Sequence, residues 1–114
     1  MRPGPAPVQR YGTTIRLHPE AEIEYKKYHQ AVWPEVLHTI SECNIRNYSI
    51  YLRGNILFAY FEYVGEDFAA DMARMASDPK TQEWWTIMKS LQDPFPDRKP
   101  GDWWTTMQEV FHID

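Results

Sequence analysis

The sequence has few of the features that mark secreted, membrane-bound or nucleic-acid-binding proteins. Its single cysteine, Cys43, cannot form a disulfide within the chain, so nothing calls for an oxidising compartment. No apolar run is long enough for a signal peptide or a membrane span. Basic residues are outnumbered, 12 against 16 acidic ones, and no basic stripe is present to neutralise phosphates. We therefore expect a cytoplasmic protein that binds neither membranes nor nucleic acid.

Aromatic residues, in contrast, are abundant. They make up 15% of the chain, with five Trp and seven Tyr, and aromatic side chains with a polar tip line ligand pockets as well as cores. A chain of 114 residues can bury a core without disulfides or a structural metal. Residues 1–8 are rich in proline and lack periodicity, which predicts a disordered tail followed by one domain over 9–114.

The spacing of apolar residues predicts the order strand, helix, strand, strand, helix, strand. Strands are expected at 11–17, 46–52, 56–63 and 105–113, and helical segments at 18–30, 34–43, from 65 onward and at 80–91. Pro34 and Pro79 divide the two helical regions, and 92–102 is expected to be a loop. This order predicts an α+β fold, a ferredoxin-like βαββαβ subunit whose antiparallel sheet carries helices on one face. The other face would be apolar and bare, so we expect a homodimer.

The segment from Tyr25 to Glu35 contains the candidate reactive group. Tyr25 and His29 are four residues apart, which places a phenol and an imidazole on the same helix face. Pro34 should end the helix one turn later, so His29 would lie near open space. Taken alone, the segment is also compatible with a histidine that only completes a hydrogen bond at the edge of the core. No metal site is predicted, because the four histidines fall in separate elements.

Several separated blocks of the chain, in the same order, make it resemble the L-rhamnose mutarotase family over residues 12 to 114. The blocks are Glu24-Tyr25 with His29, Trp33-Pro34-Glu35, Asn47-Tyr48-Ser49-Ile50-Tyr51-Leu52, Trp84-Trp85 and Met107-Gln108-Glu109-Val110-Phe111. The resemblance implies a ferredoxin-like subunit that forms a dimeric α+β barrel. It also implies that His29 is the catalytic acid/base and that Tyr25, Tyr48, Trp84 and Trp85 contact the sugar. The N-terminal extension, Gln30-Ala31 and the Trp103-Trp104 pair depart from the family pattern, and they leave the preferred sugar open.

The function expected from this resemblance is interconversion of the anomers of L-rhamnose or a related 6-deoxy hexose. Ring opening needs a base for the anomeric hydroxyl and an acid for the ring oxygen, and histidine serves both roles near neutral pH. No cofactor is required, and the expected partners are a monosaccharide and a second copy of the chain. The alternatives are a cofactor-free monooxygenase or haem-degrading protein of the same barrel class, and a barrel that binds a ligand without chemistry. By pattern alone, both Trp84 and Trp85 could instead be core residues, and so could Tyr48.

Overall fold

A computed structural model describes residues 7–114. The strands are β1 (Gln9–Leu17), β2 (Ile45–Arg53), β3 (Ile56–Tyr63), β4 (Gln92–Asp93) and β5 (Thr105–Met107). The helical elements are the 3-10 turn η1 (Pro19–Ala21) and the helices α1 (Glu22–His29), α2 (Pro34–Glu42), α3 (Phe68–Ala76) and α4 (Pro79–Leu91). The expected tail is described only at residues 7 and 8, which form no regular structure; residues 1–6 lie outside the described part.

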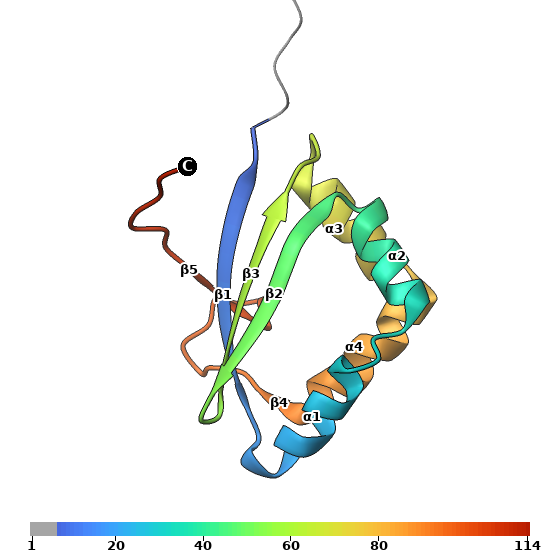
Figure 1. The fold of residues 1–114 in the computed structure, drawn as a ribbon, viewed down its shortest axis with the longest axis vertical. Helices are drawn as coiled ribbons and strands as arrows, with labels where there is room; N and C mark the ends of the chain where they lie inside the picture. The colour runs from blue at the N-terminus through green and yellow to red at the C-terminus, as the bar shows by residue number, and fades with distance from the viewer. Residues whose placement is uncertain (1–6) are drawn as a thin grey trace, which may run out of the picture.

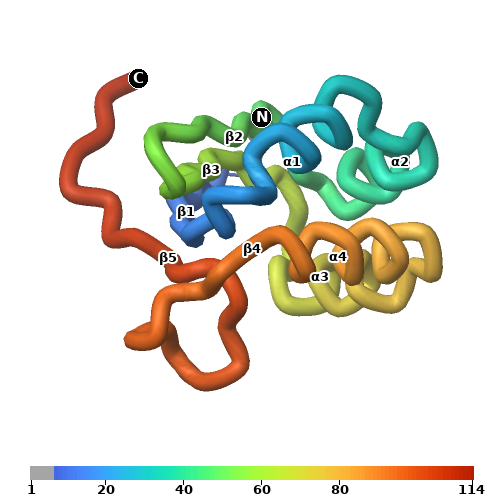
Figure 2. The backbone as a smooth tube through the Cα atoms, turned by 90° about the horizontal axis from the view of Figure 1, so that it is seen from below, coloured from blue at the N-terminus to red at the C-terminus, as the bar shows by residue number. Residues whose placement is uncertain are grey.

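The strands form one curled antiparallel sheet in the order β2-β3-β1-β4, with β5 also paired to β1. The helices cover one face of this sheet, and the C-terminal segment leaves on the other side (Figure 1). Figure 2 shows the same layering from below. The predicted α+β class and the antiparallel sheet with helices on one face are therefore confirmed.

Both proline breaks occur where the sequence predicts them, because proline can occupy the first turn of a helix but not its interior. Pro34 opens α2 after a short gap that follows α1, and Pro79 opens α4 directly after the end of α3. Asp78 caps α4, its carboxylate accepting the backbone N–H of Thr81 at 2.9 Å. These breaks let four short helices follow the curvature of the sheet.

The core lies between the helices and the inner face of the sheet. The inner residues Ile15, Leu17 and Leu57 are almost fully buried, and they pack with Tyr25, Val36, Trp84, Met88 and Leu91 from the helices. A second cluster at the other end contains Cys43, Ile45, Tyr63 and Met75, so the lone cysteine is a buried core residue. Within the described residues, no helix is long and apolar enough to cross a bilayer.

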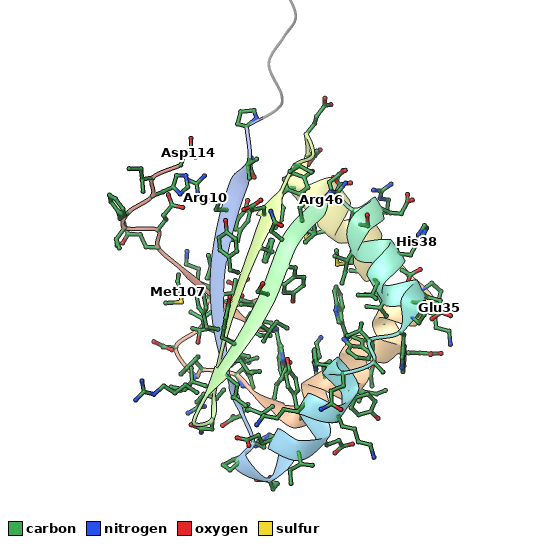
Figure 3. The ribbon with its side chains drawn as sticks, viewed as in Figure 1. Arg10, Glu35, His38, Arg46, Met107 and Asp114 are labelled. Atoms are coloured by element: carbon green, nitrogen blue, oxygen red, sulfur yellow. The ribbon has the colours of Figure 1, made fainter. Side chains whose placement is uncertain are left out.

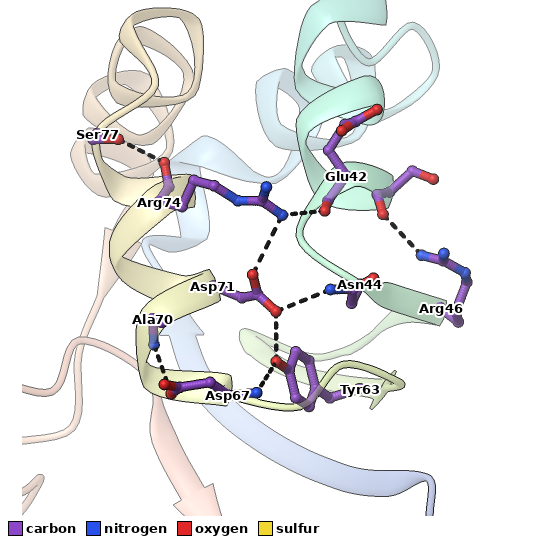
Figure 4. A network of polar contacts seen from close by, with 10 residues as sticks. Glu42, Asn44, Arg46, Tyr63, Asp67, Ala70, Asp71, Arg74 and Ser77 are labelled. Atoms are coloured by element: carbon purple, nitrogen blue, oxygen red, sulfur yellow. Dashed lines mark hydrogen bonds and ion pairs between the residues drawn. The ribbon is translucent and has the colours of Figure 1, made fainter. Parts of the chain in front are cut away.

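A polar network attaches α3 to the strands beside the second cluster (Figure 4). The carboxylate of Asp71 accepts hydrogen bonds from the Tyr63 hydroxyl at 2.5 Å and from the Asn44 amide at 3.0 Å. Arg74 pairs with the other Asp71 oxygen and donates to the carbonyl of Glu42. Gly65 leaves room for this network, because a Cβ at that position would collide with the Tyr63 hydroxyl.

The predicted closing strand over 105–113 is wrong in its extent. Only Thr105–Met107 pairs with β1, opposite Gly12, Thr13 and Thr14, while residues 108–114 form no strand. The predicted loop in turn begins with the short strand β4, which pairs with Arg16 and Leu17 of β1. A strand needs a backbone partner as well as an alternating sequence. Two short segments share one edge of β1 here, and the end of the chain is held instead by a bidentate ion pair between Arg10 and Glu109.

Candidate active site

The predicted catalytic histidine is the last residue of α1, and its ring lies against that of Tyr25. The ring centroids are 4.3 Å apart, as the spacing of four residues predicts. His29 Nδ1 lies 2.8 Å from the backbone carbonyl oxygen of Tyr25. A carbonyl can only accept, so Nδ1 carries the proton in the neutral ring and Nε2 presents a lone pair. The helix backbone itself therefore selects the form of His29 that can act as a base.

The surroundings of the two rings shift their pKa values in ways that keep both neutral. Burial lowers the pKa of His29 below its ordinary value of 6.5, and the hydrogen bond with the Tyr25 carbonyl opposes this only in part. Burial raises the pKa of Tyr25, against a smaller lowering by a hydrogen bond from Gln92. At neutral pH the site therefore offers an unprotonated imidazole beside an intact phenol.

Trp84 of α4 forms one wall of the site. Its ring lies edge-on to His29, with centroids 5.4 Å apart, and also meets the rings of Tyr28 and Trp33. Trp84 is only 6% exposed, whereas its neighbour Trp85 is partly buried and packs against both core clusters. The two tryptophans therefore point differently, as expected for neighbours on a helix.

Tyr48 reaches the inner face of the sheet through an irregularity in β2. The pairing of β2 with β3 shifts register between Arg46 and Ser49, and Asn47 has a φ of 49°. Beyond the shift, Ile50 and Leu52 pack against the core as predicted. Tyr48 lies on the same side, 5.7 Å from Phe61 between ring centroids, but its side chain is 45% exposed. Burial nevertheless raises the pKa of the Tyr48 hydroxyl above its ordinary value.

The structure brings His29, Tyr25 and Trp84 into direct contact, while Tyr48 lies on β2 of the sheet and Trp85 on α4 of the helical layer. Two residues without a predicted role also belong here: Gln92, which contacts Tyr25, and Trp103, which contacts Gln92. Their sequence context is a loop, and no pattern connects them to a tyrosine far away in the chain. The one feature of the sequence that pointed to this region was the Trp103-Trp104 pair, which departs from the family pattern.

One surface hollow lies between α2, α3 and α4, and another lies in the loop after β4. The first is lined by Thr39 and Arg74, among others, and the second by Lys89 and Trp103. Neither includes His29, so the candidate site rests on its chemistry rather than on the shape of the surface. Within residues 7–114 no group of three or more potential ligands is placed to hold a metal ion.

Comparison with known proteins identifies relatives over nearly the whole chain. A family model described as L-rhamnose mutarotase matches residues 10–113. L-rhamnose mutarotases from Phocaeicola vulgatus and Bacteroides thetaiotaomicron are 38% and 34% identical, each match covering 94% of this chain and 100% of the relative.

Solved structures agree with these matches. The crystal structure of an L-rhamnose mutarotase from Formosa agariphila superimposes with a TM-score of 0.70 at 25% identity, covering 93% of this chain and 99% of that one. Tetracenomycin F2 cyclase from Streptomyces glaucescens has the same fold, with a TM-score of 0.61 over 93% of this chain and 99% of that one. Its identity of 13% carries no functional information.

Proposed function

This chain belongs to the L-rhamnose mutarotase family, and from that premise we propose that His29 interconverts the α and β anomers of L-rhamnose by acid/base ring opening and closing. The protein is an isomerase acting on a carbohydrate. The observation that carries the role of His29 is its Nδ1 contact with the Tyr25 carbonyl, which leaves Nε2 free to take a proton.

In the proposed mechanism one imidazole nitrogen serves both oxygens of the anomeric carbon. Nε2 of His29 removes the proton from the C1 hydroxyl, the C1–O5 bond breaks, and the electron pair of that bond leaves with O5. The imidazolium then gives its proton to O5, so the free aldehyde forms and His29 is neutral again. Rotation about C1–C2 presents the other face of the aldehyde, and the same steps in reverse close the ring to the other anomer. O1 and O5 are bonded to the same carbon, so both lie within reach of a single base.

The aromatic residues around His29 are the proposed sugar contacts. Trp84 and Trp85 offer apolar faces for the C–H surface and the methyl group of a 6-deoxy sugar. Tyr25 and Tyr48 offer hydroxyls for hydrogen bonds to sugar oxygens. Trp84 also packs directly against the His29 ring, so it has a second role in holding the base in place.

A homodimer in which two sheets pack face to face, forming an α+β barrel, is part of this proposal. The face of the sheet without helices exposes Tyr51, Ile56 and Phe58. The C-terminal segment on the same side exposes Met107, Val110, Phe111 and Ile113. Several large apolar side chains exposed on one side of a sheet are typical of an interface. The cytoplasmic location expected from the sequence stays a prediction.

The test of this function is saturation-transfer NMR on the anomeric protons of L-rhamnose, with L-fucose, D-glucose and D-galactose as comparison sugars. We expect the protein to accelerate anomer exchange of L-rhamnose, and His29→Ala to remove the acceleration. Unchanged exchange for all four sugars with the wild-type protein would contradict the proposal. Equal exchange rates for wild type and His29→Ala would show that another residue acts as the base.

A further inference from the structure

We propose that Gln92 and Trp103 are positioning residues that fix the direction of the Tyr25 hydroxyl, so that Tyr25 accepts a hydrogen bond from the protein and donates its own proton to the sugar. This inference rests on the proposed function for its catalytic consequence. The hydrogen-bond chain itself is a feature of the structure: Trp103 Nε1 lies 2.8 Å from Gln92 Oε1, and Gln92 Nε2 lies 3.4 Å from the Tyr25 hydroxyl.

The chain has a definite direction, because its first member can only donate. An indole N–H has no acceptor capacity, so the side-chain oxygen of Gln92 must face Trp103. The amide nitrogen of Gln92 then faces Tyr25 and must donate to it. The phenol oxygen is thereby occupied as an acceptor, and its O–H points elsewhere.

The O–H of Tyr25 remains available to donate a hydrogen bond to the substrate. Among the described residues no acceptor is found for it, and its ring lies beside that of His29, tilted by 30° with the centroids 4.3 Å apart. The proton can therefore be offered to a sugar oxygen held beside Nε2 of His29. A donor next to the base stabilises the negative charge that develops on the sugar when the ring opens.

Burial prevents water from competing for the hydrogen bonds of Gln92. Gln92 is 5% exposed, so its side-chain amide does not have bulk solvent as an alternative partner. Trp103 is held from the outside by Lys89 and Arg98, whose charged groups lie 5.5 Å and 5.8 Å from the centroid of its ring. Trp103, in the loop after β4, thus holds Gln92 in one orientation.

The sharpest test reverses the direction of the chain. In Gln92→Glu a carboxylate accepts from Trp103 and also accepts from Tyr25, so the Tyr25 proton is drawn away from the sugar. In Gln92→Met the volume is kept but the donor is lost, and in Trp103→Phe the donor that orients Gln92 is lost. The matched control is Trp104→Phe, which removes an indole N–H from the neighbouring residue, whose ring packs against the core.

We expect kcat for L-rhamnose anomer exchange to fall about tenfold in Gln92→Met, the effect of one hydrogen bond, and further in Gln92→Glu. KM should change little, and Trp104→Phe should retain the wild-type kcat. A second readout does not depend on activity. The Cζ chemical shift of Tyr25 at pH 7 should change in Gln92→Met, because its hydroxyl loses the hydrogen bond from Gln92. The Trp103 indole proton should exchange faster with solvent in the same variant.

These readouts separate the two proposals. A wild-type protein that accelerates no sugar would overturn the mutarotase mechanism, while the Tyr25 Cζ shift and the exchange of the Trp103 indole proton would still decide whether the hydrogen-bond chain exists. An active wild type with unchanged kcat and an unchanged Tyr25 Cζ shift in Gln92→Met would overturn the positioning role. Loss of thermal stability in Gln92→Met without either change would mean that Gln92 is structural only.

Discussion

At the scale of single residues, the backbone and not another side chain sets the tautomer of His29 that its proposed role requires. Its Nδ1 partner is the carbonyl of the residue one turn earlier, so any helix with a histidine in this rotamer can select the same tautomer. What distinguishes His29 is its place at the end of α1, between the rings of Tyr25 and Trp84. The other helical histidine, His38, points outward from α2 with its side chain 74% exposed (Figure 3).

This contrast predicts different outcomes for two identical substitutions. His29→Ala should lower the L-rhamnose exchange rate by about 10²–10⁴-fold, the usual contribution of a positioned acid/base, while the protein remains folded. His38→Ala should leave the rate within about twofold of wild type, because the residue is exposed and distant from the site. NMR exchange rates measure the first effect, and circular dichroism confirms folding. Equal losses in both variants would contradict the assignment.

The lowered pKa of His29 predicts the position of the acid limb of the pH profile. The base must be unprotonated, so activity should fall as pH decreases through the pKa of His29 in the folded protein. That pKa lies below 6.5, so half-maximal kcat/KM is expected at a pH below this ordinary value. Exchange rates between pH 4.5 and 8 measure it, with an NMR titration of the His29 ring as the independent control. A half-maximal rate above pH 6.5 would argue for a different base.

At the scale of elements, α3 is attached to the sheet by the network around Asp71, which joins the start of β2 and the end of β3 to the helix (Figure 4). Hydrogen bonds from Tyr63 and Asn44, with the Arg74 charge, lower the pKa of Asp71 below its ordinary 3.8. A carboxyl group whose pKa is depressed on folding stabilises the protein above the unfolded value, and that stabilisation is lost as pH falls through the folded value.

Asp71→Asn should therefore lower the free energy of unfolding at pH 7, and the difference from wild type should shrink below about pH 3.8 as Asp71 in the wild type is protonated. Urea unfolding at pH 7 and at pH 3 measures it. Asp97→Asn, which changes an exposed loop carboxylate, is the control and should show no such pH-dependent difference. If the difference in free energy of unfolding between wild type and Asp71→Asn grew towards pH 3, it would contradict the role of the charge.

At the scale of the whole molecule, the helices and the exposed apolar surface lie on opposite sides of the sheet. Residues 108–114 follow β5 without joining a strand, although their sequence alternates, and Val110 is 90% exposed. In the proposed homodimer a second copy would cover this segment together with the outer face of β2 and β3. The monomer therefore presents a strand-forming sequence whose partner is expected from another chain.

Placing a charge on that face should weaken the dimer. Phe58→Glu puts a carboxylate at the centre of the outer face and should raise the dimer dissociation constant by about 100-fold or more, since an unpaired charge would be buried. Ile23→Glu makes a similar change on α1, where the side chain is 81% exposed away from that face, and should leave association unchanged. Sedimentation over a concentration series measures both. A monomeric wild-type protein at all concentrations would contradict the dimer.

Local periodicity was enough to predict the first three strands and the helix breaks, because these features depend on residues close together in the chain. Alternation placed β1 to β3 to within two residues, Pro34 and Pro79 marked the helix breaks, and a spacing of four placed Tyr25 beside His29. The sharing of one edge of β1 between β4 and β5 could not be predicted in this way, since it depends on which segments reach that edge once the chain is folded. Only the tertiary structure decided that Gln92 and Trp103 meet Tyr25, a contact across 67 residues between Gln92 and Tyr25. No local pattern records which side chains folding will bring together over such a distance.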